Sequence, residues 1–475
     1  MTATARAGAR AVAPLALPDP PVLSPAAWRA LDDEVVALLQ EFLRVPTVNP
    51  PGNELALARM IAALLAQAGI EHELVQTAPE RAVITGRLRG RGAGEQAGVL
   101  LLAHMDVVDV EPREWTVDPF GGELRDGYLY GRGAIDDKGM LAANLATVLG
   151  LQRHLTATGA TLERDVVFVA TPDEEAGSEA GLVWLLEHRP ELLAAACALN
   201  EGGRVRVVDG RPLYAAVQTA EKVPHLLALR AQGPSGHASV PLRENALVRL
   251  ARAVAVVGAH AEPLRLGETT REFFARLAAI WPEPHLADAM AAVVSGDAAR
   301  MAEGERVLAA HPAYDAVLRT GISAVRLEGG IRENVIPAEG TAFLNVRTLP
   351  GESIDGTVAR LRAAIDDPHV ELSVVSRGAD APASPVDAPM FAALTESLRD
   401  LVPGLAVAPY LSTGATDNAR LRRAGIPAYG LLPFPLPPED EARMHGHDER
   451  VRVDALRFGV RVLVGAVARV AGCDA

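Results

Sequence analysis

The chain contains a short, uninterrupted apolar run at residues 98–103, and the next residue in the sequence is a histidine. Uniform apolarity, without the alternation of a half-exposed strand, is typical of a strand buried on both faces of a sheet. A second such run lies at residues 166–170, and apolar residues at helical spacing occupy residues 141–155 between the two. Buried strands that alternate with helices predict a layered α/β domain.

The pattern changes near residue 220. Strands are predicted at residues 225–231, 322–327 and 341–347, with helices at residues 241–257 and 354–365. This block resembles a self-contained α+β unit, and 475 residues exceed what one hydrophobic core usually holds. We therefore predict an α/β domain formed by residues 25–220 and 379–475, interrupted by a unit of residues 221–378. Residues 1–24, rich in Ala and Pro, are predicted to form a loose leader.

Composition argues against several classes of protein. The formal net charge is −14 and no long Lys or Arg run occurs, so a nucleic-acid partner is not expected. No segment reaches the length of an uncharged membrane span, and the expected location is cytoplasmic. The two cysteines, Cys197 and Cys473, cannot form a disulfide scaffold or a thiolate metal site. Cys197 lies in an apolar stretch and is expected to be buried.

Metal-binding residue types follow the predicted strands or lie in glycine-bounded loops. These segments are His104-Met105-Asp106, Asp136-Asp137, Glu174-Glu175, Asn200-Glu201 and His445-Gly446-His447. Ligands collect at strand ends in open α/β sheets. Taken singly, each segment can also be a capped strand end, a tight turn or a solvated acidic loop. Together they provide histidines and carboxylates without cysteine, which suits Zn²⁺, Co²⁺ or Mn²⁺ in a hydrolytic site.

Three of the segments indicate specific chemistry. Asp106 would project to the same side as His104 in an extended chain and can fix the orientation of a metal-bound imidazole. Adjacent glutamates repel each other unless a cation or proton offsets their charge. One of Glu174 and Glu175 can therefore bind a metal while its neighbour acts as a general base. Of Asp136 and Asp137, one can bridge two metals and the other can cap the following helix.

With these residues in place, the chain resembles the M20 family of metallopeptidases over essentially all of its length after the leader. The stretch from His104 to Gly139 is especially similar to the branch of carboxypeptidase S and the N-acyl-amino-acid hydrolases. The resemblance implies a fold of the α/β class, in which a mixed-sheet, helix-flanked metal-binding catalytic domain is interrupted by an inserted α+β lid and dimerisation domain. It also implies two divalent metal ions, with zinc expected and cobalt or manganese as alternatives.

The resemblance implies a role for each residue of the first domain. Asp136 would bridge the two metals, His104 and Glu201 would hold one of them, and Glu175 and His445 would hold the other. Glu174 would be the general base, and Asp106 would steady His104. His445 is assigned in preference to His447 because the ligand of the family precedes the Asp/Asn-Glu pair by three residues.

The inserted unit matches the family as well. His237 in Gly233-Pro234-Ser235-Gly236-His237 resembles the lid histidine that reaches a catalytic centre, often that of a partner subunit. Asn334 and Arg347 resemble lid groups that hold the substrate, and Thr413 and Gly414 lie in a segment that resembles the loop lining the substrate cleft. Arg347 can bind a carboxylate with two parallel hydrogen bonds, while His237 and Asn334 can donate to a developing oxyanion.

These residues predict a hydrolase that cleaves an amide bond beside a free carboxylate in an N-acyl amino acid or a short peptide, with a homodimer formed through the lid. A dipeptidase of the same family and a catalytically silent metal-binding homologue are the alternatives. The paired Glu174 and Glu175 argue against the silent homologue, because a scaffold needs no general base. A serine hydrolase is disfavoured since the Gly-x-Ser-x-Gly elbow is missing from the sequence.

Overall fold

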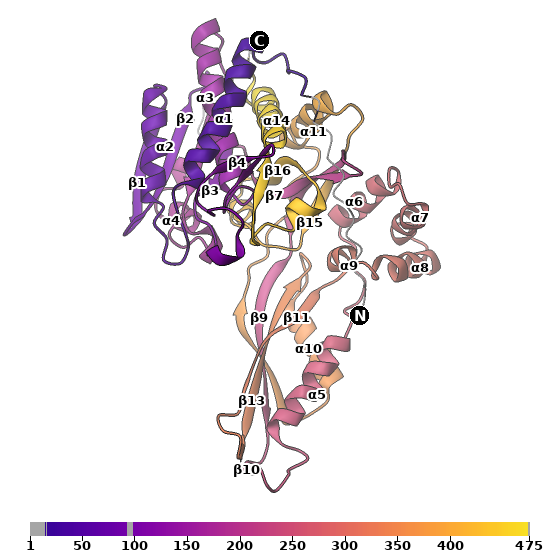
Figure 1. Cartoon of the computed structure of the whole chain (residues 1–475). Helices are drawn as coiled ribbons and strands as arrows, with labels where there is room; N and C mark the ends of the chain where they lie inside the picture. Colours follow the sequence, from indigo (N-terminus) through magenta and orange to yellow (C-terminus); the bar gives the residue numbers. More distant parts are fainter. Residues whose placement is uncertain (1–14, 16, 93–97, 474–475) are drawn as a thin grey trace. The chain divides into compact units, whose positions relative to one another are not determined.

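A computed structural model describes residue 15, residues 17–92 and residues 98–473 of the chain. The chain divides into two compact units. The first unit consists of Met1–Val217, Pro385–Val407 and Ala424–Ala475, and the second of Gln218–Ser384 and Ala408–Arg423, counting only the residues described. Figure 1 shows the helices and strands of both units along the chain.

An eight-stranded mixed sheet runs in the order β1-β2-β6-β3-β7-β16-β8-β15. Its strands are β1 (Glu71–Ala78), β2 (Arg81–Leu88), β3 (Val99–His104), β6 (Val166–Thr171), β7 (Cys197–Val208), β8 (Arg211–Glu221), β15 (Ala406–Ser412) and β16 (Ala428–Leu436). Every residue of β3 and β6 is buried, as their continuous apolar sequences predict.

The central strands are parallel, which brings their carboxyl ends to one edge. β3 pairs with β6 in parallel, with His104 opposite Thr171, and with β7, with Val99 opposite Cys197. β16 pairs in parallel with β7 and lies between β7 and β8 in the sheet. Segments that leave β3, β6 and β7 therefore begin at the same edge, where open α/β sheets bind their ligands.

Helices cover this sheet, and short elements complete the first unit. The helices α3 (Lys138–Thr158) and α14 (Val453–Ala471) contact each other, and both contact α1 (Pro25–Leu43). The remaining elements are α2 (Leu55–Gln67), α4 (Leu182–His188), α11 (Pro389–Leu401), α13 (Pro438–Glu441), the 3₁₀ turns η1 (Pro112–Glu114), η2 (Glu174–Ala176) and η3 (Pro190–Leu193), and a small sheet in the order β17 (Arg450–Arg452), β5 (Tyr128–Tyr130), β4 (Glu123–Arg125).

The second unit is built on a four-stranded antiparallel sheet in the order β11-β13-β9-β14. The helices α5 and α10 pack against this sheet (Figure 1). The core between them includes Leu227, Leu250, Leu344 and Leu361. Its elements are β9 (Val223–Gln232), β10 (Gly236–His237), α5 (Ala246–Ala259), α6 (Glu268–Ala278), α7 (Pro284–Val293), α8 (Ala298–Leu308), α9 (Pro312–Leu318), β11 (Gly321–Gly329), β12 (Val335–Ile336), β13 (Glu339–Thr348), α10 (Ile354–Ile365), β14 (Val370–Arg377) and α12 (Asn418–Arg423).

The predicted fold class is confirmed: a mixed α/β sheet is accompanied by a separate antiparallel α+β sheet. The helix predicted over residues 354–365 begins and ends at those residues, because the Ser353 side chain accepts from the amide of Asp355 and Asp366 ends the helix in the left-handed conformation. The helix predicted from residue 241 begins instead at Ala246. Asn245 caps it by accepting from the Val248 amide at 3.0 Å.

Part of the predicted leader, residues 1–14 and 16, lies outside the described residues. The described remainder has defined contacts: Pro20 accepts from the indole of Trp28 at 2.9 Å, and Asp19 pairs with Arg461 at 2.8 Å. Within the described ranges, no helix is both long and apolar enough to cross a membrane.

Candidate metal centre

Four of the five predicted ligands, His104, Asp136, Glu175 and His445, lie together beside the carboxyl edge of the parallel strands. His104 is the last residue of β3, Glu175 lies in η2 directly after β6, and Asp136 precedes α3. The nearest ligand atoms of these three side chains all lie within 4.8 Å of one another. Local apolar sequence places the strands in the interior, and the first polar residue after each one therefore emerges at the shared edge.

The Asp136 carboxylate lies between two imidazoles. Its Oδ1 is 3.0 Å from Nε2 of His104, and its Oδ2 is 3.2 Å from Nε2 of His445. His445 Nε2 is also 3.1 Å from Oε1 of Glu175. An aspartate with one oxygen toward each of two nitrogen ligands has the arrangement that a bridging carboxylate requires.

The negative charges of the carboxylates in this cluster require positive charge nearby. Burial works to raise the pKa of Asp136, but hydrogen bonds with His104 and His445 outweigh it and lower the pKa. Hydrogen bonds with Asp136 and Glu175 raise the pKa of His445 to about 10. Protons on the two imidazoles thus offset the carboxylates. Divalent ions bound to the same nitrogen and oxygen atoms would supply that positive charge in their place.

His104 is held by Asp106 on its other ring nitrogen. Nδ1 lies 3.0 Å from the backbone oxygen of Asp106 and 3.4 Å from its Oδ1. Burial lowers the pKa of His104, but its hydrogen bonds with Asp106 and Asp136 overcome this and hold the pKa well above the ordinary value. The Asp106 carboxylate also accepts from the amides of Glu174 at 3.1 Å and Glu175 at 3.0 Å. Asp106 therefore joins the histidine to the turn that carries both glutamates.

Asp137 has a different role from the helix cap considered in the sequence. It occupies the N-cap position of α3, but its side chain makes no capping hydrogen bond. Its Oδ2 accepts instead from the His104 amide at 3.2 Å. Burial, together with the negative charges of Glu201 and Asp136, holds the pKa of Asp137 well above its usual range. Glu201, buried in β7, therefore lies close enough to influence this acidic group.

Sequence reasoning missed the part played by Glu449. Its carboxylate accepts from the amides of Gly133 at 3.1 Å, Ile135 at 2.8 Å and Asp136 at 3.1 Å, and it pairs with Arg132 at 2.7 Å. The loop that presents Asp136 is thus held by the same segment that contributes His445. The only sequence signal for Glu449 is its place in the Asp-Glu pair after His447. No local pattern indicates its four partners, which are distant in sequence.

The predicted groups of the second unit fall into three places. His237 is the last residue of β10 and lies opposite Val335 of β12. The backbone oxygen of Asn334 accepts a hydrogen bond from the Ala238 amide at 3.0 Å. His237 and Asn334 therefore lie on neighbouring segments. Nδ1 of His237 accepts from the Ser239 amide at 3.1 Å, so a neutral ring carries its proton on Nε2.

Arg347 lies on β13 and is only partly engaged. Its Nε donates to Asn345 Oδ1 at 3.0 Å, whereas its Nη1 is buried without a hydrogen-bond partner among the residues described. Burial lowers the pKa of this guanidinium. A buried guanidinium nitrogen without a partner is costly, and an anionic ligand would satisfy it.

Thr413 and Gly414 lie in the loop after β15. The Gly414 amide donates to the Ser412 hydroxyl at 3.2 Å. Further along the loop, Thr416 donates to the Glu221 carboxylate through its amide at 2.9 Å and its hydroxyl at 3.1 Å. Glu221 also pairs with Arg422 at 2.8 Å, so this buried ion pair fixes the loop.

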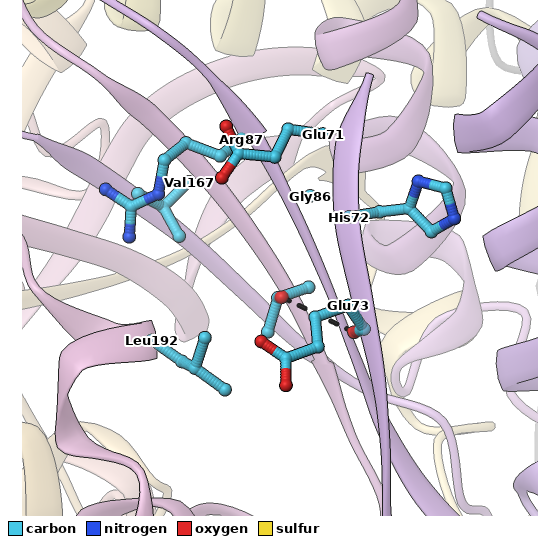
Figure 2. A pocket seen from close by; sticks show the side chains of 8 residues that line it. Glu71, His72, Glu73, Gly86, Arg87, Val167 and Leu192 are labelled. Carbon is cyan, nitrogen blue, oxygen red and sulfur yellow. Dashed lines mark hydrogen bonds between the residues drawn. The ribbon is translucent and has the colours of Figure 1, made fainter. Parts of the chain in front are cut away.

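A separate pocket of about 330 Å³ lies on β1 and β2, and Figure 2 shows its lining. None of the candidate residues above lines it. Its charged groups already have protein partners: Glu71 pairs with Arg89, Glu73 with Arg189 and Arg87 with Asp165. We assign no chemistry to this pocket.

Two imidazoles and several carboxylates lie together beside the carboxyl ends of the central parallel strands, an arrangement that suits a metal-dependent hydrolase. Residues 100–469 match the peptidase family M20/M25/M40, and the chain belongs to that family. It is therefore an enzyme of the M20 metallopeptidase and amidohydrolase class.

Three relatives illustrate the range of the family. The chain is 30% identical over 374 residues to the N-fatty-acyl-amino acid synthase/hydrolase of Xenopus tropicalis, covering 77% of this chain and 71% of the relative. An M20 family metallo-carboxypeptidase from Sulfolobus solfataricus shares the fold with a TM-score of 0.66 at 19% identity, over 92% of this chain and 99% of the other. A Bacillus subtilis protein described as a dinuclear metal binding peptidase of the family has a TM-score of 0.58 at 15% identity, over 94% and 100% of the two chains.

Proposed function

We propose that this enzyme cleaves an amide bond adjacent to a free carboxylate, in N-acyl amino acids or in peptides attacked from the carboxyl end. The observation that carries the proposal is the Asp136 carboxylate between the imidazoles of His104 and His445. The partly unpaired guanidinium of Arg347 supports a substrate carboxylate. A hydrolase of N-fatty-acyl amino acids and a carboxypeptidase among the relatives support both substrate types.

The donor set fits two divalent ions. We assign His104 and Glu201 to one ion, Glu175 and His445 to the other, and Asp136 to both. Zinc is our choice from the nitrogen and carboxylate donors, with cobalt or manganese as substitutes. Bound there, the ions would polarise the scissile carbonyl and lower the pKa of the attacking water.

The protein groups then divide the remaining work. Glu174 takes the proton from the attacking water and returns it to the leaving amine. His237, with its proton on Nε2, and Asn334 donate hydrogen bonds to the oxyanion that develops on the carbonyl. Arg347 binds the substrate carboxylate, and Thr413 and Gly414 line the substrate site. Asp106 keeps the His104 ring in one orientation.

The proposal extends to assembly and location. We propose that the second unit acts as a lid and mediates a homodimer, and that His237 acts in the site of the partner. The strand β11 lies at an edge of the antiparallel sheet and exposes Val325 and Leu327, which favours association there. Neither Cys197 nor Cys473 forms a disulfide within the described residues, which agrees with a cytoplasmic location.

The test is hydrolysis of N-acyl amino acids and dipeptides by the wild type and Glu174→Gln, with chelator and then with added Zn²⁺ or Co²⁺. Glu179→Gln is the matched control, since Glu179 is exposed in the same turn. Loss of a general base should lower kcat by roughly 10²–10⁴-fold, while the control keeps its rate.

The substrate panel distinguishes the alternatives. Cleavage of N-acyl amino acids supports the proposal, whereas strict dependence on a dipeptide with a free amine supports the dipeptidase. Two bound metals without turnover of any substrate would contradict the proposed substrate class. Bound metal without any turnover is also what the silent metal-binding homologue predicts, whereas a chain that binds no metal would contradict the proposed metal centre.

A further inference from the structure

A buried hydrogen-bonded group around Asn49 and Arg81 lies beside the candidate metal centre and has no role in the steps above. Asn49 begins the segment Asn-Pro-Pro-Gly, and Arg81 is the first residue of β2. Both side chains reach Asp173, the residue directly before Glu174. The group therefore contacts the turn that carries the proposed general base.

The Asn49 amide joins two carboxylates. Its Nδ2 donates to Asp106 Oδ2 at 2.8 Å and to Asp173 Oδ1 at 3.1 Å. Its Oδ1 accepts from Arg81 Nη2 at 2.7 Å. Because a guanidinium can only donate, the amide oxygen must face Arg81, and the NH₂ group must face the two aspartates. Arg81 thus fixes the orientation of this amide.

Arg81 is itself held in a single position. Its Nη1 pairs directly with Asp173, and its Nη2 donates to the Pro51 oxygen at 2.7 Å as well as to Asn49. Gly52 makes this approach possible: a Cβ there would lie 2.2 Å from the guanidinium carbon. The turn after Asn49 is therefore shaped around the guanidinium.

Asp173 anchors the turn that follows it. Its φ of 72° lies in the left-handed region, which a non-glycine residue keeps only when its surroundings determine it. Its Oδ2 accepts from the Ala180 amide at 2.9 Å, and its backbone oxygen accepts from the Ser178 amide. Arg81 and Asn49 hold Oδ1. The backbone that presents Glu174 and Glu175 is consequently fixed at Asp173 and at Asp106.

Arg81 is also one of the cations in a crowded acidic region, together with the buried Lys138. Asp106, Asp173 and Glu54 are all buried around Arg81, and Glu54 Oε1 lies 3.7 Å from its Nη1. Neither oxygen of Glu54 has a hydrogen-bond partner within the described part of the chain. Without the guanidinium, buried carboxylates would repel each other at the base of the turn.

We infer that Arg81, acting through Asn49 and Asp173, is a positioning residue that places Glu174 and keeps Asp106 oriented toward His104. This inference rests on the proposed function for Glu174 and names a residue outside the metal ligands and the substrate-binding groups. Arg81 pairs with Asp173 and donates to Asn49, and it acts on the site through these two residues and through its charge.

The test compares Arg81→Met with Arg87→Met. Both arginines lie on β2 and both pair with an aspartate, Arg81 with the buried Asp173 and Arg87 with the part-buried Asp165, but only the first pair reaches the turn. Arg81→Met is expected to lower kcat roughly 10–100-fold with KM within about twofold, and to weaken Zn²⁺ binding measured by calorimetry. Arg81→Lys, which keeps the charge, should recover part of the rate. Arg87→Met should match the wild type in kcat and zinc affinity.

Equal kcat and equal zinc affinity in the two Met variants would overturn the inference while leaving the proposed function intact. If the wild type cleaves no amide in the panel, the proposed function fails, and the zinc isotherms alone decide the positioning role of Arg81. If Arg81→Met does not fold, Asn49→Ala replaces it. That variant removes only the amide bridge, and an unchanged kcat and zinc affinity would equally overturn the inference.

Discussion

The carboxylate of Glu449 accepts a hydrogen bond from the backbone amide of Asp136, 313 residues earlier in the chain. Glu449→Ala would leave Arg132 without its buried counter-charge. We expect this variant to lose about 3–5 kcal/mol of unfolding free energy in urea denaturation. Glu439→Ala, at an exposed position nearby, should change it by less than about 0.5 kcal/mol. Equal stability of the two variants would contradict the structural role of Glu449.

Arg347 should determine selectivity for a carboxylate. Removal of a charge-assisted hydrogen bond costs about 1.5–3 kcal/mol, so Arg347→Met should lower kcat/KM for N-acyl amino acids about 10–100-fold. The methyl ester of the same substrate lacks the negative charge, and its kcat/KM should change little. Steady-state kinetics on the acid and the ester measure the difference. An equal loss on both compounds would mean that Arg347 does not bind the carboxylate.

Glu54 should make stability depend on pH. Burial raises the pKa of its carboxyl from 4.5 to about 7, so between these values the folded protein binds more protons than the unfolded chain. Stability from this group is therefore present at low pH and is lost as pH rises toward 7. Glu54→Gln does not titrate, and its stability relative to wild type should rise by roughly 2–3 kcal/mol from about pH 5 to pH 8.

Denaturation midpoints at the two pH values check this expectation. Glu80→Gln is the control, because Glu80 is exposed at the turn before β2. A constant difference between Glu54→Gln and wild type across the range would show that Glu54 is ionised in the folded protein.

Cys197 should be unreactive in the folded state. Burial raises the pKa of its thiol to about 12, so about one molecule in 10⁴ carries the thiolate at pH 8. Iodoacetamide should label Cys197 only in denaturant, whereas the partly exposed Cys473 should react in the native protein. Peptide mass spectrometry distinguishes the two sites. Rapid native labelling of Cys197 would contradict its burial.

Much of the fold could be predicted from local sequence patterns. Uninterrupted apolar runs predict β3 and β6, and the candidate site begins at their ends, with His104 at the end of β3 and the Asp173-Glu174-Glu175 turn shortly after β6. The bounds predicted for helix α10 agree with the structure, in which Ser353 caps its start and Asp366 ends it in the left-handed conformation. Helix α5 begins later in the chain than predicted, at Ala246, because the Asn245 side chain caps its first turn.

The hydrogen bonds that support the site could not be predicted from local sequence patterns. Arg81 donates a hydrogen bond to Asp173, 92 residues further along the chain, and Arg422 donates to Glu221, 201 residues earlier. No periodicity or turn signal links such positions, because their partners are determined by the order of strands in the sheet. Ordinary polar residues such as Asn49 and Glu449 acquire their significance only after the strands are paired.

The position of β16 has a consequence for synthesis on the ribosome. This strand belongs to the last tenth of the chain, yet it lies between β7 and β8. A nascent chain that ends before Ala428 has a gap at the middle of its main sheet, and His445 has not yet been made. The second unit, which ends at Arg423, is complete earlier. The inserted unit should therefore form first, and the candidate metal centre can assemble only after His445 has been made.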